Sequence, residues 1–147
     1  MKNHRAPLTL ASVLFCIVPS FAHHMAVVVN KESSVAAVTS LQLAKILLLE
    51  ERKWPGGREV LVVLHSDHAG ETLTLGHLCG MSVRDIRIFV ASHKNSFTEV
   101  DSDRDVLRIV EATPGAVGLV DVRSINDQVR VLKVDGKLPM EEGYLPH

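Results

Sequence analysis

The side chains that could form a binding site lie in one polar segment, His65-Ser66-Asp67-His68-Ala69-Gly70-Glu71-Thr72. The segment follows a run of strand-forming residues and precedes a helical pattern, so a helix N-terminus is expected within it. The free N–H groups and the positive dipole end of a helix N-terminus can bind a small anion. A plain strand–helix turn would have the same pattern, and both interpretations stay open at this point.

Imidazoles and carboxylates alternate in the same segment, and this combination suits zinc or copper. His65 and His68 could reach one ion if the loop turns back on itself. His23 is a third candidate ligand, because processing that made it the N-terminus would place a free amine beside its imidazole, a pair that chelates copper. The alternative is that all three are solvated polar residues. His77 is expected on a helix surface and not at this site. No cofactor is predicted.

Two elements must position this segment. Val60–Leu64 is a continuous apolar run, which is typical of a strand covered on both faces. From Glu71 onward the apolar residues recur with helical spacing. In open α/β sheets, ligands bind outside the carboxyl ends of the strands. The polar segment is therefore expected at the edge of the sheet where a binding site would form.

The rest of the chain alternates strand and helix patterns, which predicts an α/β layered domain with a mixed, largely buried sheet and flanking helices. Further strands are expected at 26–30 and 116–120, and a last one over 129–134. Residues 93–101 are polar and are expected to form a loop.

Three further helices are predicted from their N-terminal caps. Thr39, Ser82 and Ser102 are each followed three residues later by Gln or Asp, which is the spacing of a capping box. The segment Trp54-Pro55-Gly56-Gly57 is expected to end the first of these helices.

The composition limits the class of protein. The chain has 147 residues, of which 46% are hydrophobic and 22% are charged, so it has room for one domain with a substantial core. Aromatic residues make up 4%, and the formal net charge is −1. Neither base stacking nor electrostatic attraction favours a nucleic-acid partner.

The first 22 residues have the pattern of a secretory signal peptide. Lys2 and Arg5 give a positive start, an apolar stretch covers 8–18, and small residues end at Ala22. The predicted exported domain is 23–147, with the periplasm as its expected location. Cys79 is the single cysteine of that range, so no internal disulfide is expected despite export.

Four motifs follow one another along the chain: VTSLQLAKILL at 38–48 with Trp54 after it, VVLHSDHAGET at 62–72, TPGAVGLV at 113–120 and VLKVDG at 131–136. In this order they resemble the motifs of the PstS-like phosphate-binding proteins, the periplasmic receptors of phosphate ABC transporters. The resemblance implies the type 2 periplasmic-binding-protein fold. Because the chain is about half the usual length of that family, it implies one lobe of the fold.

The resemblance also implies an anion site. Ser66, Asp67, Gly70 and Thr72 match the family's loop motif V-V-x-R-S-D-G-S-G-T-T. His65 stands where the family has an arginine, and it would be a cationic replacement that works best when protonated, below a pH of about 6.5, the ordinary pKa of histidine.

Two further departures weaken the expected site. Ala69 replaces the family's phosphate-binding serine, and Glu71 replaces its threonine. The Glu71 carboxylate is expected at the helix N-terminus, where it would satisfy the helix dipole itself and repel an incoming anion. The loss of a guanidinium and a hydroxyl predicts weak phosphate binding.

The expected function is therefore that of a non-catalytic periplasmic solute-binding protein for phosphate or another small oxyanion. Its partners would be that anion and an ABC transporter, or another envelope protein if the lobe is an interaction module. A homodimer could rebuild a closed cleft. A periplasmic metal-binding protein is the alternative. The sequence has no G-x-S-x-G, H-E-x-x-H or Walker motif, so an enzyme is not expected.

Overall fold

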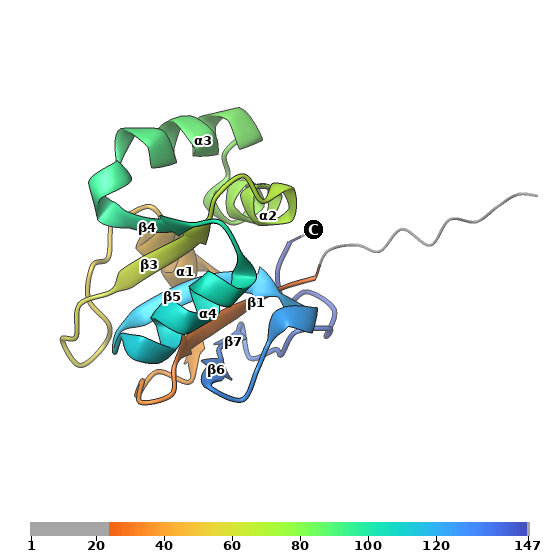
Figure 1. Cartoon of the computed structure of the whole chain (residues 1–147). Coiled ribbons are helices and arrows are strands. Elements are labelled where there is room, and N and C mark those ends of the chain that lie inside the picture. The colour runs from red at the N-terminus through yellow and green to blue at the C-terminus, as the bar shows by residue number, and fades with distance from the viewer. Residues whose placement is uncertain (1–23, 147) are drawn as a thin grey trace, which may run out of the picture.

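A five-stranded sheet forms the centre of the computed structural model, which describes residues 24–146 (Figure 1). The predicted signal peptide and His23 lie outside the described residues. In spatial order the strands are β4 (Phe97–Val100), β3 (Leu61–His65), β5 (Ala116–Asp121), β1 (Met25–Asn30) and β6 (Val129–Val131). Two short strands, β2 (Ala37–Val38) and β7 (Lys133–Val134), form a separate parallel pair.

The central sheet is mixed, as predicted. β3 runs parallel to its neighbours β4 and β5, whereas β1 runs antiparallel to β5 and β6. Every residue of β1 and β5 is buried. Both strands read as continuous apolar runs because helices or chain segments cover both of their faces.

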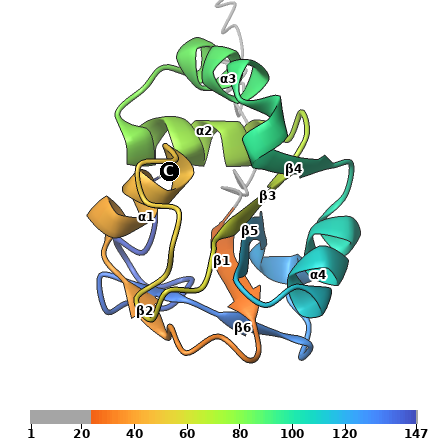
Figure 2. The same ribbon diagram turned by 90° about the vertical axis from the view of Figure 1, so that its left-hand side faces the viewer.

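Helices pack on the two faces of the sheet. The helices α1 (Ser40–Leu47) and α2 (Ala69–Cys79) lie on one face, with α3 (Val83–Ser92) packed on α2, and α4 (Asp103–Ala112) lies on the opposite face (Figure 2). The core is correspondingly divided, with Val27 and Val117 in the first layer and Val28 and Val63 in the layer beneath α4. None of the helices in the described part of the chain is both long and apolar enough to span a bilayer.

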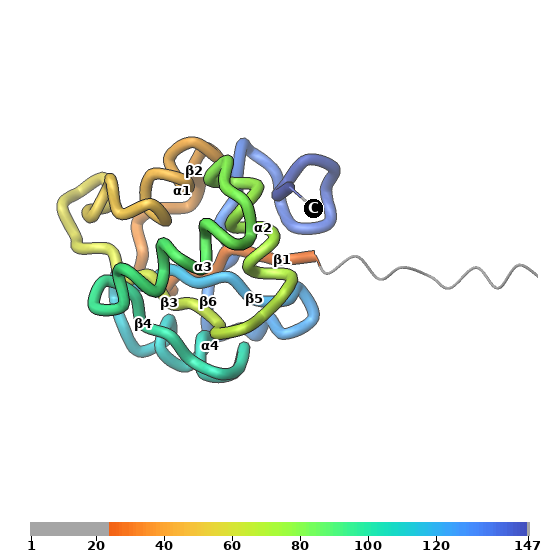
Figure 3. Tube along the Cα trace, turned by 90° about the horizontal axis from the view of Figure 1, so that it is seen from above, coloured from red at the N-terminus to blue at the C-terminus, as the bar shows by residue number. Residues whose placement is uncertain are grey.

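The C-terminal segment returns to the first strand, β1 (Figure 3). The buried Tyr144 hydroxyl accepts a hydrogen bond from the Val27 amide at 3.2 Å and donates one to the Leu132 carbonyl at 2.6 Å. Burial raises the pKa of Tyr144 to about 12, so this hydroxyl keeps its proton and its donor role.

The three predicted caps are confirmed. The Thr39 side chain accepts from the Gln42 amide at 3.1 Å, and the Gln42 side chain accepts in return from the Thr39 amide. The Ser82 and Ser102 side chains cap α3 and α4, each accepting at 3.1 Å from the backbone amide three residues later. The caps fix where these helices begin because they satisfy first-turn N–H groups that have no partner inside the helix.

The predicted loop over 93–101 is wrong in its second half. Residues Phe97–Val100 form β4, the edge strand beside β3, after a short 3₁₀ turn at Lys94–Ser96. Phe97 is the single buried residue of β4. An edge strand buries little of its surface, so its composition resembles that of a loop.

Two other boundaries differ from the prediction. The helix α1 ends at Leu47, ahead of Trp54, and Leu49 follows with a left-handed φ of 62°. The single strand expected over 129–134 is two strands in two different sheets, β6 and β7. Leu132 lies between them, and its amide donates to the Val27 carbonyl at 2.9 Å while the chain crosses from one sheet to the other.

Candidate functional site

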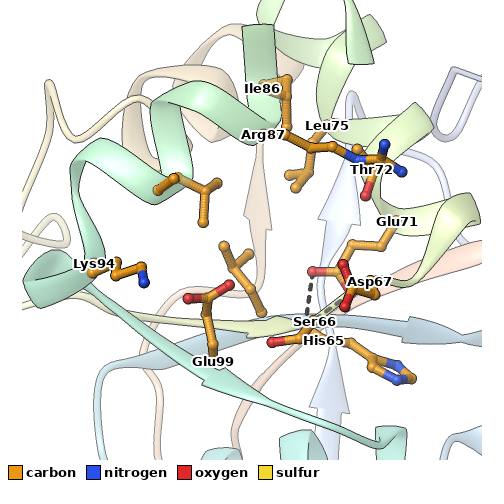
Figure 4. A pocket seen from close by; sticks show the side chains of 13 residues that line it. His65, Ser66, Asp67, Glu71, Thr72, Leu75, Ile86, Arg87, Lys94 and Glu99 are labelled. Carbon is orange, nitrogen blue, oxygen red and sulfur yellow. Dashed lines mark hydrogen bonds between the residues drawn. The ribbon is translucent and has the colours of Figure 1, made fainter. Parts of the chain in front are cut away.

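A cavity of about 220 Å³ opens at the carboxyl end of β3, between the N-terminus of α2 and the helix α3 (Figure 4). The polar segment singled out in the sequence forms one wall, and α3 with the following turn forms the other. The polar residues that line it are His65, Ser66, Asp67, Glu71, Thr72, Arg87, Lys94 and Glu99.

Four of the five predicted anion-site residues, His65, Ser66, Asp67 and Thr72, line this cavity. Within residues 24–146, the Ser66 hydroxyl makes no hydrogen bond, so it can donate to a ligand. The Thr72 hydroxyl donates to the His68 carbonyl at 3.1 Å and would have to rotate to donate to an anion. Asp67 is exposed and adopts a left-handed φ of 55°.

Gly70 lies in the first turn of α2 and does not line the cavity. The helix begins at Ala69, two residues before the predicted start, because His68 is its N-cap and its Nδ1 accepts from the Glu71 amide at 3.0 Å. In the described part of the chain, the amides of Ala69 and Gly70 have no hydrogen-bond partner. Their N–H groups remain available at the helix N-terminus.

The expectation for Glu71 is wrong in its geometry. Its side chain turns inward and is 2% exposed, and both carboxylate oxygens accept from the His65 amide, at 3.1 and 3.2 Å. The Glu71 carboxylate therefore accepts from the last amide of β3 and not from the first-turn amides of α2. Burial raises the pKa of Glu71 well above its ordinary value, the His65 hydrogen bond opposes this shift, and the charge of Asp103 adds to it.

The raised pKa of Glu71 predicts a pH-dependent effect of Glu71→Gln. A carboxyl whose pKa is higher in the folded state contributes stability below its unfolded pKa, about 4.3, and that contribution is lost as the pH rises through the folded pKa. The glutamine of the variant is neutral throughout and can still accept from the His65 amide. The stability of the variant relative to the wild type should therefore increase as the pH rises from about 4 toward the folded pKa, by about 1.4 kcal/mol for each unit of pKa elevation. Thermal unfolding of both proteins across this range measures the difference, and a difference independent of pH would contradict the prediction.

His65 turns its ring away from the cavity (Figure 4). Its Nδ1 lies 2.9 Å from Oδ1 of Asp103, the first residue of α4, and both side chains are largely buried. The second carboxylate oxygen of Asp103 accepts from the Asp121 amide at 3.0 Å and from the Ser124 hydroxyl at 2.7 Å. Asp103 thus connects the N-terminus of α4 with the C-terminal ends of β3 and β5.

The predicted pair of metal ligands is brought together on this second side of the loop. The centroids of the His65 and His68 rings lie 4.7 Å apart. The two imidazoles and the Asp103 carboxylate offer ligand atoms that all lie within 4.8 Å of one another. His77 is exposed on α2 and takes no part in the cluster, as expected. The third predicted ligand, His23, lies outside the described residues.

Sequence reasoning missed Arg87, Lys94, Glu99 and Asp103. The first three approach the loop from α3, the 3₁₀ turn and β4, and no spacing within the sequence relates them to residues 65–72. Asp103 had a weak signal, since it follows the predicted cap Ser102 and so lies at a helix N-terminus. Its contact with His65 depends on β3 and the start of α4 meeting at one edge of the sheet.

Comparison with known proteins supports the predicted fold. No family model matches the chain. An ABC-type phosphate transport receptor from Vibrio cholerae is similar in structure, with a TM-score of 0.64 and 19% identity over 79% of this chain and 48% of its own. A protein assigned as a phosphate ABC transporter substrate-binding protein from Clostridium perfringens, solved with bound phosphate, has a TM-score of 0.64 and 20% identity over 77% of this chain and 45% of its own.

PstS from Borrelia burgdorferi is also similar, with a TM-score of 0.59 and 18% identity over 79% of this chain and 49% of its own. The chain therefore spans about half the length of the proteins it resembles. Its fold is that of one lobe of a PstS-like periplasmic binding protein, which confirms the fold class predicted from the motif order.

Proposed function

We propose that this chain is a non-catalytic solute-binding lobe that binds phosphate or another small oxyanion, weakly, in the cavity between β3, α2 and α3. The observation that carries the proposal is the convergence of Ser66, Thr72 and Arg87 on one cavity at the N-terminus of α2. It is supported by the shared fold with phosphate transport receptors, one of them solved with bound phosphate.

Arg87 supplies the positive charge in this proposal. Its guanidinium extends from α3 toward Thr72, on the side of the cavity that faces the start of α2 (Figure 4). A guanidinium offers several N–H donors in a planar fork that suits an oxyanion. The arginine that His65 replaces in the loop is thus compensated by an arginine from a different element.

The acidic side chains of the cavity account for the expected weakness. Asp67 lies on the same loop as Ser66, and Glu99 lies on the opposite wall beside Lys94 (Figure 4). Both carboxylates are exposed and would repel an anion when ionised. A protonated Glu71 would instead offer an O–H donor, and burial favours that form. An oxyanion that carries its own proton, such as monohydrogen phosphate, could donate to Asp67 and be preferred to sulfate.

The proposal is tested by isothermal titration calorimetry with phosphate and sulfate. Arg87→Ala should weaken phosphate binding about tenfold, equivalent to about 1.4 kcal/mol and close to the value of one charge-assisted hydrogen bond. Arg84→Ala is the matched control, because Arg84 is an exposed arginine of the same helix that does not line the cavity. Equal losses in the two variants, or no heat of binding at millimolar phosphate, would refute the site.

The role in the cell is part of the same proposal. We infer export to the periplasm from the pattern of residues 1–22, and cooperation with an ABC transporter from the proteins that share the fold. A second copy of the chain, or another envelope protein, would supply the surface that closes over the ligand. Cross-linking in the presence and absence of phosphate tests for such a partner.

A further inference from the structure

We propose that His65, His68 and Asp103 form a binding site for a divalent transition-metal ion, with zinc and copper as the ions that match the ligands. The cluster lies on the α4 side of the loop, whereas the proposed anion cavity lies on its α3 side. This inference does not depend on anion binding, and it joins the two histidines predicted from the sequence with a carboxylate that only the fold brings near them.

The distances are close to those of a metal centre. The ligand atoms of the three residues lie within 4.8 Å of one another, and His65 Nδ1 lies 2.9 Å from Asp103 Oδ1. Ligand atoms around a tetrahedral zinc ion lie roughly 3.4 Å apart, given metal–ligand distances of about 2.1 Å. Small side-chain rotations would bring the three groups to one ion, and water would complete the coordination.

The carboxylate is held in place by groups behind it. Oδ2 of Asp103 accepts from the Ser124 hydroxyl at 2.7 Å and from the Asp121 amide at 3.0 Å, while Oδ1 faces His65. Partners of this kind orient the ligands of metal sites, and their loss weakens metal binding about 10- to 100-fold. One carboxylate oxygen of Asp103 is therefore hydrogen-bonded to protein groups that fix its position, and the other faces the histidines, where it could bind a metal ion.

The cluster is reachable from solvent. A shallow cavity of about 380 Å³ is lined by His68, Asp103, Ser124, Asp121 and Arg123. The positive charge of Arg123 is matched by Asp121, which it contacts with two hydrogen bonds of 2.9 Å. Among the residues that line this cavity, the Asp103 charge therefore remains, and it favours a cation.

Metal binding would exchange two existing contacts. The His65 ring would give up its contact with Asp103, and the His68 ring would give up the cap that its Nδ1 provides to the Glu71 amide. A neutral imidazole has one lone pair for coordination, so it cannot accept that amide and bind a metal through its other nitrogen at the same time. Metal binding should therefore shift the amide signal of Glu71.

The test is a zinc titration of the chelator-treated full chain, followed by calorimetry and by amide NMR. His68→Asn is the sharpest variant, because Asn is itself a good helix cap and should preserve α2 while removing the imidazole. We expect zinc affinity to fall about 100-fold in His68→Asn and in His65→Ala, and about tenfold in Ser124→Ala. The Glu71 amide should shift in the wild type and not in His68→Asn.

Two controls decide between metal sites. His77→Ala removes an exposed histidine of α2 and should leave zinc binding unchanged. A variant that replaces both His23 and His24 by Ala, in a chain processed to begin at residue 23, tests the alternative site at the N-terminus, which depends on the free amine that processing creates. Loss of binding in that variant, retention of binding in His68→Asn, or no zinc binding by the folded wild type at micromolar concentration would each overturn the proposal.

Discussion

Replacement of Trp54 by alanine is expected to lower the free energy of unfolding by about 3–5 kcal/mol. The indole is 4% exposed within the core layer on the α1 side of the sheet. Its Nε1–H donates to the Gly115 carbonyl at 2.9 Å, which connects the segment after α1 to the turn before β5. The variant would lose both the buried ring and this connection.

Trp54→Phe separates the two contributions. Phenylalanine keeps most of the buried apolar area and leaves the Gly115 carbonyl without its indole donor. We expect a loss of about 0.5–1.5 kcal/mol, the net contribution of one hydrogen bond, because the Gly115 carbonyl still accepts from the Leu61 amide at 3.2 Å. Urea unfolding of the three proteins measures the differences. If Trp54→Ala were no more destabilising than Trp54→Phe, the packing of the ring would not be the main contribution.

Asn30→Asp is expected to destabilise the fold by about 3–5 kcal/mol at neutral pH, the cost of a buried charge without a partner. The Asn30 amide group is buried and donates to the carbonyls of Val110 and Glu111, at 2.9 and 2.8 Å, at the end of α4. Helix-terminal carbonyls have no partner inside the helix, so they depend on such a donor. An aspartate would place a negative oxygen against both carbonyls.

Asn30→Ala is the matched control for the charge. It also leaves the two carbonyls unsatisfied but adds no repulsion, so we expect a smaller loss of about 1–3 kcal/mol. The Asp variant should approach the Ala variant at low pH, where a protonated carboxyl can donate to one carbonyl. Chemical unfolding at two pH values checks this, and equal losses for Asp and Ala at neutral pH would contradict the electrostatic explanation.

Trp54 follows the first of the segments that carry the family resemblance, Asn30 ends β1, which pairs with β5 of the TPGAVGLV segment, and both residues are structural. Trp54 donates to Gly115 of the TPGAVGLV motif, and Gly115 has a left-handed φ of 88°. A Cβ there would collide with the Glu59 carbonyl. These motifs therefore predict the fold, because they reflect the packing and turn geometry that the fold requires.

The strands and caps were predictable because their signals are local. The apolar runs of β1, β3 and β5 follow from burial on both faces. The caps at Thr39, Ser82 and Ser102 follow from side chains that satisfy amides three residues away. The edge strand β4 was not predictable in the same way, because it buries Phe97 alone and takes its strand conformation from pairing with β3.

The candidate site was predictable only in part. The segment 65–72 could be identified because strand, glycine and helix patterns adjoin within it. The inward turn of Glu71 depends on the His65 amide at the end of β3, and the approach of Arg87 depends on how α3 packs on α2. Contacts of this kind are set by the tertiary structure and leave no periodic signal.

The most direct test of the proposed solute-binding function is an amide NMR titration of the wild-type protein with phosphate. The structure places the available N–H groups of Ala69 and Gly70 at the start of α2, with Ser66 and Thr72 beside them. We predict saturable shifts of these four amides, with much smaller shifts in Arg87→Ala at equal phosphate concentration. Absence of saturable shifts, or shifts confined to residues away from this loop, would contradict the assignment of the lobe as an oxyanion-binding module.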